Sequence, residues 1–308
     1  MYTYQVFFHV GYPKAASTSL QRNLFLNHPD INYLSPQIWY NFYDNLKFLD
    51  SVLDRNNLKN NPKDILENQI KTYFKLNQKN VFSDERMIDQ FSDEQLDNTS
   101  KANRIKLCIP NAKIIIMIRN QIDLIRSWYD FLFPDTSLDK WLTKLFNNQQ
   151  QGYRFLECLN FYETVSFYHY LFGKENVKIL LFEELKYEPN LFCRKLSDFM
   201  EISKKDTINA LIKNKEIYRN YQHNYYHYRR VRAKLLPHFQ VSKYIPFPIY
   251  RITKESIQKM IETSNPKLSP SYVKNKNNLQ KINDYYASSN LKLQQLLDCD
   301  INKYNYPL

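Results

Sequence analysis

The chain has 308 residues, of which 43% are hydrophobic and 24% charged, as is ordinary for a globular protein. No block of like charge exceeds a few residues, which excludes a disordered basic tail. The formal net charge of +12 favours anionic partners, namely nucleotides, acidic polysaccharides, nucleic acids or membrane surfaces, without choosing among them.

The four cysteines, Cys108, Cys158, Cys193 and Cys299, are scattered and form no C-x-x-C pair, so we expect free thiols in a reducing compartment. The N-terminus lacks the basic region of a signal peptide, and no apolar stretch reaches the roughly 18 residues that would span a membrane. We therefore expect a cytoplasmic protein.

The first predicted strand is the apolar run YQVFFHV at 4–10, which Gly11 and Pro13 end. A helix is predicted at 18–28, with Ser17 or Thr18 available as its N-cap. Further helices are expected at 37–54, 62–77 and 92–107, with a short strand between them at 80–85.

The strongest strand signal is AKIIIMIRN at 112–120. Its apolar residues run without alternation, which is typical of a strand buried on both faces of a parallel sheet. It passes directly into the amphipathic helix QIDLIRSWYDFLF. A helix closed by Gly173, a buried strand at 176–185 and the helical segment LFCRKLSDFM follow.

Residues 1–200 therefore alternate strand and helix, the pattern of an open parallel α/β sheet. Residues 203–308 show no clear strand and are expected to be helical. We predict a three-layer α/β/α fold with a central parallel sheet, in one domain over 1–308. Its core, to about residue 200, would bind a nucleotide, and residues 201–308 would form a helical C-terminal part.

The loop after the first strand, GYPKAASTS, has the groups that a phosphate or sulfate needs. It brings the ammonium of Lys14 and a row of hydroxyls to the start of a helix, where unpaired N–H groups and the helix dipole attract anions. The hydroxyls belong to Ser17, Thr18 and Ser19.

The spacing of this loop differs from two common nucleotide-binding motifs. The dinucleotide fingerprint needs three glycines, and this loop has only Gly11. The Walker A loop needs its lysine directly before the magnesium-binding Ser or Thr, but Ala15 and Ala16 separate Lys14 from Ser17. The loop thus predicts nucleotide binding without the usual magnesium geometry.

GYPKAASTSLQ resembles the 5′-phosphosulfate-binding loop of sulfotransferases that use 3′-phosphoadenosine 5′-phosphosulfate (PAPS). In the family pattern P-K-x-G-T/S-T, Ala16 stands where glycine is usual, and alanine fits there if the backbone is not left-handed. The resemblance implies that the following residues hold the 5′ end of PAPS: Gly11, Pro13, Lys14, Ala15, Ala16, Ser17, Thr18 and Ser19.

A second segment resembles the family's 3′-phosphate motif, R-N-x-x-D-x-x-x-S-x-Y. Its residues stand in register as Arg119, Asn120, Asp123, Ser127 and Tyr129. Arg119 offers a guanidinium fork, and Ser127 lies about two helical turns further on, on the same side. The resemblance implies that these two residues hold the 3′-phosphate, two strands away from the first loop. An ordinary surface arginine and a helix serine are the alternative.

Three further segments are similar to parts of the same family. The tail ending in Y-N-Y-P resembles that of bacterial and carbohydrate-type members, and 160–185 resembles their middle helix and strand. The basic run at 219–236 implies that Arg229 or Arg230 also contacts PAPS, although a solvated helix face explains it equally well.

The resemblance implies a P-loop-like fold and a PAPS-dependent sulfotransferase. Such an enzyme transfers a sulfuryl group, by in-line displacement, to a hydroxyl or amine of a carbohydrate or polysaccharide, and Lys14 neutralises charge on the leaving phosphate. A P-loop-type small-molecule kinase and a non-catalytic polyanion-binding module remain the alternatives. No binding to nucleic acid is expected, and peripheral contact with a membrane stays open.

Carbohydrate sulfotransferases often have a catalytic carboxylate at the end of the second strand, where this chain has Asp84 and Glu85. We expect Glu85 to be the base, with Asp84 second, because strand alternation sends one of the two toward the cleft. An acid pair that stabilises a helix N-terminus is the alternative. His9 is a further candidate base, but a histidine within an apolar strand more often packs in the core.

No metal is expected. His223 and His227 have the i, i+4 spacing of a zinc helix, but the glutamate of H-E-x-x-H and a third ligand are missing.

Overall fold

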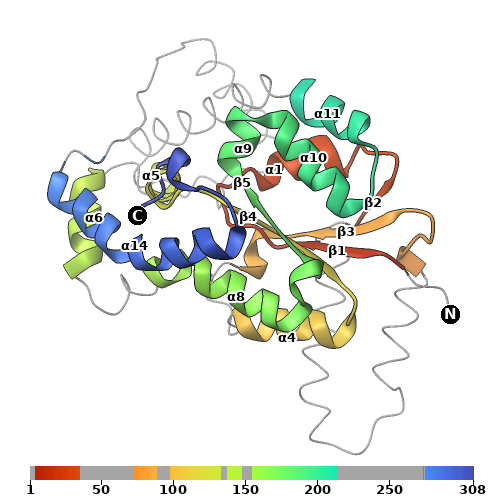
Figure 1. Cartoon of the computed structure of the whole chain (residues 1–308), viewed down its shortest axis with the longest axis horizontal. Coiled ribbons are helices and arrows are strands. Elements are labelled where there is room, and N and C mark those ends of the chain that lie inside the picture. Colours follow the sequence, from red (N-terminus) through yellow and green to blue (C-terminus); the bar gives the residue numbers. More distant parts are fainter. Residues whose placement is uncertain are drawn as a thin grey trace, which may run out of the picture.

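Five parallel strands form the centre of the molecule (Figure 1). The computed structural model describes residues 4–34, 72–88, 98–132, 137–147, 155–213, 273 and 275–308. The strands are β1 (Val6–His9), β2 (Ile31–Leu34), β3 (Lys79–Ser83), β4 (Lys113–Ile118) and β5 (Val177–Leu181). Their order in the sheet is β2-β3-β1-β4-β5, which confirms the predicted central parallel sheet.

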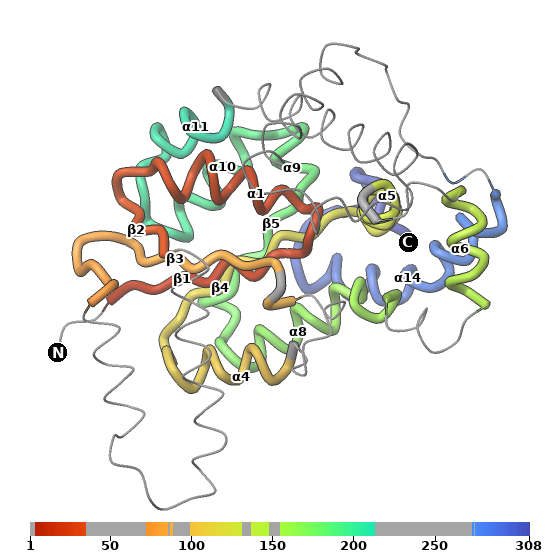
Figure 2. Tube along the Cα trace, turned by 180° about the vertical axis from the view of Figure 1, so that it is seen from behind, coloured from red at the N-terminus to blue at the C-terminus, as the bar shows by residue number. Residues whose placement is uncertain are grey.

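Helices cover both faces of this sheet, so the fold has three layers (Figures 1 and 2). One face carries α1 (Ser17–Ser19), which continues as the π-helix η1 (Leu20–Phe25), with α9 (Phe182–Tyr187), α10 (Pro189–Met200) and α11 (Lys204–Lys213). The other carries α4 (Asn98–Cys108) and α8 (Phe161–Phe172). The long C-terminal helix α14 (Lys276–Leu297) packs along α8 and α6 (Leu138–Asn147), and α5 (Gln121–Leu132) follows β4.

The short 3-10 helices are η2 (Glu85–Met87), η3 (Lys174–Asn176) and η5 (Asn302–Tyr304). The sequence did not predict the edge strand β2, which has only four residues, or the helix α6. The helices expected at 37–54 and 62–77 lie almost entirely outside the described residues.

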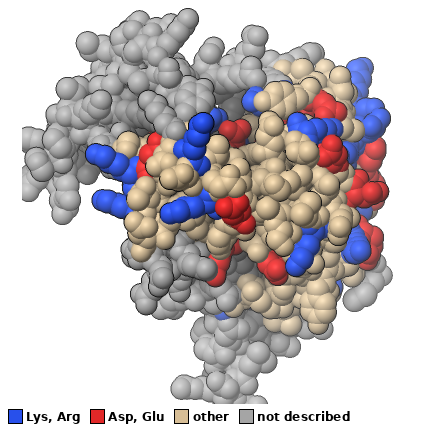
Figure 3. All heavy atoms as spheres, turned by 60° about the vertical axis from the view of Figure 1, so that its left-hand side comes forward, with Lys and Arg blue, Asp and Glu red and all other residues tan. Residues whose placement is uncertain are grey.

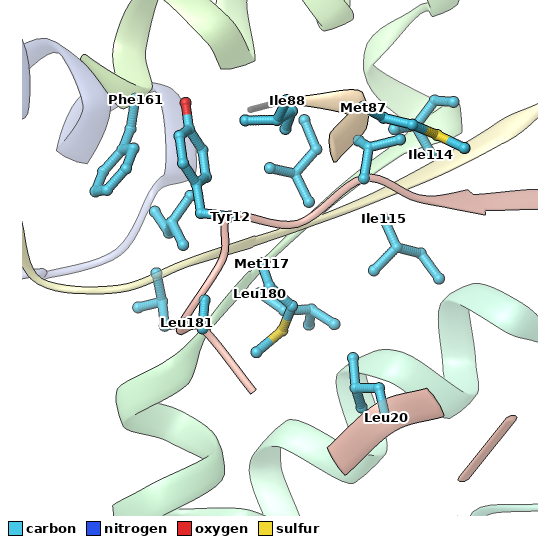
Figure 4. Close-up of a cluster of buried hydrophobic side chains, with 14 of the residues drawn as sticks. Tyr12, Leu20, Met87, Ile88, Ile114, Ile115, Met117, Phe161, Leu180 and Leu181 are labelled. Atoms are coloured by element: carbon cyan, nitrogen blue, oxygen red, sulfur yellow. The ribbon is translucent and has the colours of Figure 1, made fainter. Parts of the chain in front are cut away.

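The core forms because β1 and β4 are covered on both sides. Phe7 and Phe8 of β1 point to opposite faces of the sheet and are both fully buried. In Figure 4, Ile114 and Ile115 of β4 likewise point to opposite faces, and Leu20 of η1 packs on one of them. Each such side chain contributes about 1.5–3 kcal/mol by leaving water. This packing holds the ends of β1 and β4 in fixed positions.

The strand order has a switch point between β1 and β4. After β1 the chain places β2 and β3 on one side of it, and it then crosses to place β4 and β5 on the other side. Ligands of open α/β sheets bind outside the carboxyl ends of the strands at such a switch point. The expectation that the two anion-binding segments are two strands apart is wrong, because β4 pairs directly with β1.

The loop after β1 leaves the sheet along β4. The amides of Val10 and Tyr12 donate to the carbonyls of Ile115 and Met117, at 2.9 and 3.0 Å. Gly11 lies between them, and a Cβ there would be 2.8 Å from His9 Nε2 and from Met117 Cβ. The glycine is needed for this close approach, which fixes where the loop begins.

Two residues of the loop have left-handed backbone, Lys14 with φ 68° and Ala16 with φ 69°. Ala16 is the N-cap of α1, and no side chain among the described residues caps this helix end. The expectation that Ser17 or Thr18 caps the helix is therefore wrong, and so is the condition that position 16 avoids the left-handed region. Alanine is accommodated there at a strain of about 1 kcal/mol, because its Cβ crowds the following carbonyl.

Replacement of Ala16 by glycine, Ala16→Gly, is expected to stabilise the protein by about 0.5–1 kcal/mol, because glycine adopts the left-handed conformation without strain. Urea denaturation at equilibrium measures this change in the free energy of unfolding.

The matched control is Ala15→Gly. Ala15 is fully buried and has no positive φ, so glycine there should destabilise the protein by about 0.5–1 kcal/mol through the entropy of the unfolded chain. Equal destabilisation by both substitutions would contradict the strain assigned to Ala16.

Candidate functional site

The loop after β1 and the segment after β4 meet in one direct contact. Arg119 directly follows β4, and its Nη1 donates a hydrogen bond to the carbonyl oxygen of Lys14, at 2.9 Å. The same guanidinium lies over the ring of Phe182, 4.4 Å from its centroid. The structure thus brings together the two predicted site segments and fixes Arg119 between a loop carbonyl and an aromatic face.

The first turn of α1 presents groups suited to an anion. Ser17 is only 1% exposed, and its Oγ has no hydrogen-bond partner among the described residues. A buried hydroxyl left in this state costs about 1–3 kcal/mol, which a bound oxyanion would offset. Thr18 and Ser19 are half-buried, and Ser19 Oγ accepts a hydrogen bond from Asn23 Nδ2 at 3.3 Å.

The helix end itself favours the same kind of ligand. Within the described residues no side chain caps α1, so no cap occupies the N–H groups of Ser17 and Thr18 or the positive end of the helix dipole, while the Ser19 N–H donates to the Ala16 carbonyl at 2.9 Å. Three residues of the loop are buried, namely Gly11, Pro13 and Ala15. The residues present fit the phosphate or sulfate end of a nucleotide donor.

The predicted residues on α5 fall into different environments. Ser127 is half-buried, two turns along the helix. Asp123 instead forms an ion pair with Arg126 at 2.9 Å, and Tyr129 is buried against Trp141 with ring centroids 5.9 Å apart. Of these, Ser127 remains the candidate ligand, while Asp123 and Tyr129 support the helix.

The two candidate carboxylates differ in exposure. Asp84 is 7% exposed, and its N–H donates to the carbonyl of His9 at 3.2 Å, continuing the β1–β3 ladder. Burial and, second, the charge of Asp84 raise the pKa of Tyr33 to about 12. Glu85 begins η2 and is half-buried.

His9 is a packed core residue. It is fully buried, its Nδ1 shares a 2.7 Å hydrogen bond with Ser83 Oγ, and its ring stands edge-on to Phe25. Burial lowers the pKa of His9 to about 3, so the ring is neutral at ordinary pH. These surroundings favour the packing interpretation over a catalytic base.

Sequence reasoning missed two residues beside Arg119. Glu183 begins α9 and is 4% exposed, and its Oε1 accepts the Asn120 N–H at 3.0 Å. Tyr306, in the C-terminal tail, donates its hydroxyl to Glu183 Oε2 at 3.1 Å. The available signals were a carboxylate directly after a buried strand and the Y-N-Y-P ending, but neither identifies its partner.

A cavity of about 470 Å³ lies next to this group, between the start of α5, α9 and the tail. Phe182, the stacking partner of Arg119, is part of its wall. Its charged side chains carry both signs: Lys186 and Lys303 against Asp123, Glu183 and Glu188. The face turned forward in Figure 3 similarly mixes basic and acidic side chains on its described part.

Some predictions lie beyond what the structure describes. Arg229, Arg230, His223 and His227 fall within 214–272, outside the described residues. Within the described ranges, no group of three or more His, Cys, Asp or Glu side chains is arranged to hold a metal ion. None of the helices described has the length and apolar character needed to cross a membrane. All four cysteines are free thiols.

Comparisons with known proteins show the family and the fold of the chain. The sulfotransferase domain model matches residues 5–246. A sulfotransferase from Alicyclobacillus acidocaldarius superposes with a TM-score of 0.57 at 17% identity, covering 98% of this chain and 99% of that one. The sulfotransferase domain from the curacin biosynthetic pathway gives 0.40 at 14% identity, over 66% of this chain and 76% of that one. No curated protein matches.

The family model covers well over half of the chain, and the solved structure from Alicyclobacillus acidocaldarius has the same fold. Together with the loop after β1 and the arginine that contacts it, these matches lead to one conclusion: the chain belongs to the sulfotransferase family.

Proposed function

We propose that the protein transfers the sulfuryl group of PAPS to a hydroxyl, or an amine, of a carbohydrate or polysaccharide. The observation that carries this proposal is the 2.9 Å hydrogen bond from Arg119 to the Lys14 carbonyl, which joins two anion-binding segments at the switch point of the sheet. A donor with a charged group at each end of one nucleoside suits such a pair of segments. Membership of the sulfotransferase family supports PAPS as that donor.

In this proposal the loop after β1 binds the 5′ end of the donor. The Lys14 ammonium, the Ser17 hydroxyl and the uncapped first turn of α1 supply positive charge and hydrogen-bond donors. Thr18 and Ser19 add hydroxyls on the same turn. The buried Ser17 Oγ supports this role, because a bound oxyanion provides the partner that it lacks among the described residues.

The segment after β4 binds the 3′-phosphate. Arg119 has further N–H groups beyond the one given to Lys14, and a guanidinium can bind phosphate through two parallel hydrogen bonds. Ser127 adds a hydroxyl two turns along α5. Arg229 or Arg230, outside the described residues, is a further proposed contact with PAPS.

The chemistry requires little covalent participation by the protein. An acceptor oxygen attacks sulfur as a carboxylate, Glu85 or Asp84, takes its proton, and the bond from sulfur to the 5′-phosphate oxygen breaks in line. The products are a sulfate ester and adenosine 3′,5′-bisphosphate (PAP). Lys14 neutralises the charge that develops on the leaving oxygen, which is the main electrostatic contribution.

Three features support the remaining assignments. The resemblance to carbohydrate-type members favours a carbohydrate acceptor. Among such acceptors, the net charge of +12 favours an anionic polysaccharide. The four free thiols favour the reducing cytoplasm as the site of action.

Calorimetric titration without metal tests the donor assignment, with PAP and adenosine 5′-monophosphate (AMP) as ligands. We expect PAP to bind more tightly than AMP, because only PAP reaches Arg119 and Ser127. Ser127→Ala should weaken PAP binding about five- to tenfold and leave AMP binding unchanged, by loss of one hydrogen bond to a charged group.

Arg119→Ala extends the same test. It should weaken PAP about 10- to 100-fold, and AMP by a smaller factor, because the loop also loses the hydrogen bond to the Lys14 carbonyl. Equal losses for both ligands would count against the 3′-phosphate assignment. Tight binding of ATP only with magnesium would instead favour a kinase, and salt-sensitive polyanion binding without PAP affinity a non-catalytic module.

The base is tested by Glu85→Gln and Asp84→Asn. If Glu85 takes the acceptor proton, Glu85→Gln lowers kcat about 100-fold and leaves the Kd for PAP unchanged. PAP release from PAPS is measured with a polysaccharide that the wild type turns over, and Lys14→Ala serves as the variant without charge neutralisation. The reverse pattern, with full turnover in Glu85→Gln and loss in Asp84→Asn, would show that the assignment to Glu85 is wrong.

A further inference from the structure

The C-terminal tail returns to the start of α5, next to Arg119. In Figures 1 and 2 the C-terminus lies beside α5, although the two are far apart in sequence. Asn120 Nδ2 donates to the carbonyl oxygens of Tyr304, at 3.1 Å, and of Asn305. The residue that follows Arg119 is therefore bound directly to the tail.

A second contact holds the end of the tail. Asn290 of α14 donates to the Pro307 carbonyl at 2.8 Å and exchanges two amide hydrogen bonds with Gln121, at 2.8 and 3.2 Å. Asn290 and Gln121 are fully buried. The first turn of α5, the helix α14 and the tail thus form one hydrogen-bonded unit. Within this unit, α14 and the tail lie beyond residue 246, where the family match ends.

One buried carboxylate connects the tail to the backbone of the site. Glu183 accepts the Tyr306 hydroxyl with one oxygen and the Asn120 N–H with the other, at 3.1 and 3.0 Å. The Asn120 side chain meanwhile accepts the N–H groups of Ile122 and Asp123, so the start of α5 is capped without any group of a ligand.

The position of Glu183 matters because it binds the N–H of Asn120, the residue that follows Arg119. Burial raises the pKa of the Glu183 carboxyl, while the Asn120 N–H, the Tyr306 hydroxyl and the charge of Arg119 lower it. Arg119 also stacks on Phe182, the neighbour of Glu183 in sequence. If Tyr306 released Glu183, the carboxylate could turn to the guanidinium and form a buried ion pair, which would compete with any phosphate for the same N–H groups.

We propose that Tyr306 and Glu183 are positioning residues for the subsite of the 3′-phosphate. The tail keeps Glu183 on the Asn120 N–H, so that its carboxylate does not compete with the phosphate for the Arg119 guanidinium. This inference rests on the proposed function, and it adds the last residues of the chain to the donor site.

The test compares Tyr306→Phe with the matched control Tyr286→Phe. Both tyrosines are at most 2% exposed, and each donates one hydroxyl hydrogen bond, Tyr306 to Glu183 and Tyr286 to the Leu156 carbonyl at 2.9 Å. The two variants should therefore lose similar stability. The readout is the ratio of the Kd values for AMP and PAP, which a general loss of stability does not change.

We expect Tyr306→Phe to weaken PAP about tenfold and AMP less than twofold, and Tyr286→Phe to keep the wild-type ratio. A wild-type ratio well above one that Tyr306→Phe leaves unchanged would overturn this inference and leave the proposed function intact. A wild-type ratio near one would overturn both.

Amide hydrogen exchange of the nucleotide-free protein provides a second readout. Because Glu183 holds the Asn120 N–H, exchange at Asn120 should become about tenfold faster in Tyr306→Phe and stay at the wild-type rate in Tyr286→Phe. Unchanged exchange in Tyr306→Phe would also overturn the inference, since the Tyr306 hydroxyl would then not stabilise the hydrogen bond between Glu183 and the Asn120 N–H.

Discussion

The hydrogen bond from the Arg119 guanidinium to the Lys14 carbonyl is the contact on which the site depends. It is possible because β4 pairs directly with β1, so the two strands end side by side at one edge of the sheet. The buried residues of both strands keep these ends in register. One side chain can therefore join the loop after β1 to the start of α5, and a ligand with two charged ends can contact both.

Local structure at this edge departs from the rules that the rest of the chain follows. Lys14 and Ala16 are left-handed without being glycine. Within the described part of the chain, α1 has no side-chain cap and the buried Ser17 hydroxyl has no partner. Strain and unmet hydrogen bonds of this kind gather at functional sites, where the surrounding core offsets their cost. At the start of α5 the opposite holds, because Glu183 accepts the N–H of Asn120 and the Asn120 side chain accepts those of Ile122 and Asp123.

The parts of the fold that were predictable from sequence are those that local pattern determines. The runs around Phe7 and Ile115 have no polar alternation, which indicates strands buried on both faces, and the loop with Lys14 follows directly from the first. The left-handed backbone at Ala16 was not predictable, because alanine rarely adopts it and only the packing of the loop imposes it. The contact between Tyr306 and Glu183 joins residues that are 123 positions apart, a separation that no local pattern encodes.

A crystal structure of the protein with bound PAP would show whether the two segments hold the two phosphates of one nucleotide. We expect one phosphate on the loop after β1, within hydrogen-bonding distance of Ser17 Oγ, and the other on the Arg119 guanidinium, with Arg119 still bound to the Lys14 carbonyl. A nucleotide bound elsewhere, or one whose 3′-phosphate points away from Arg119, would contradict it.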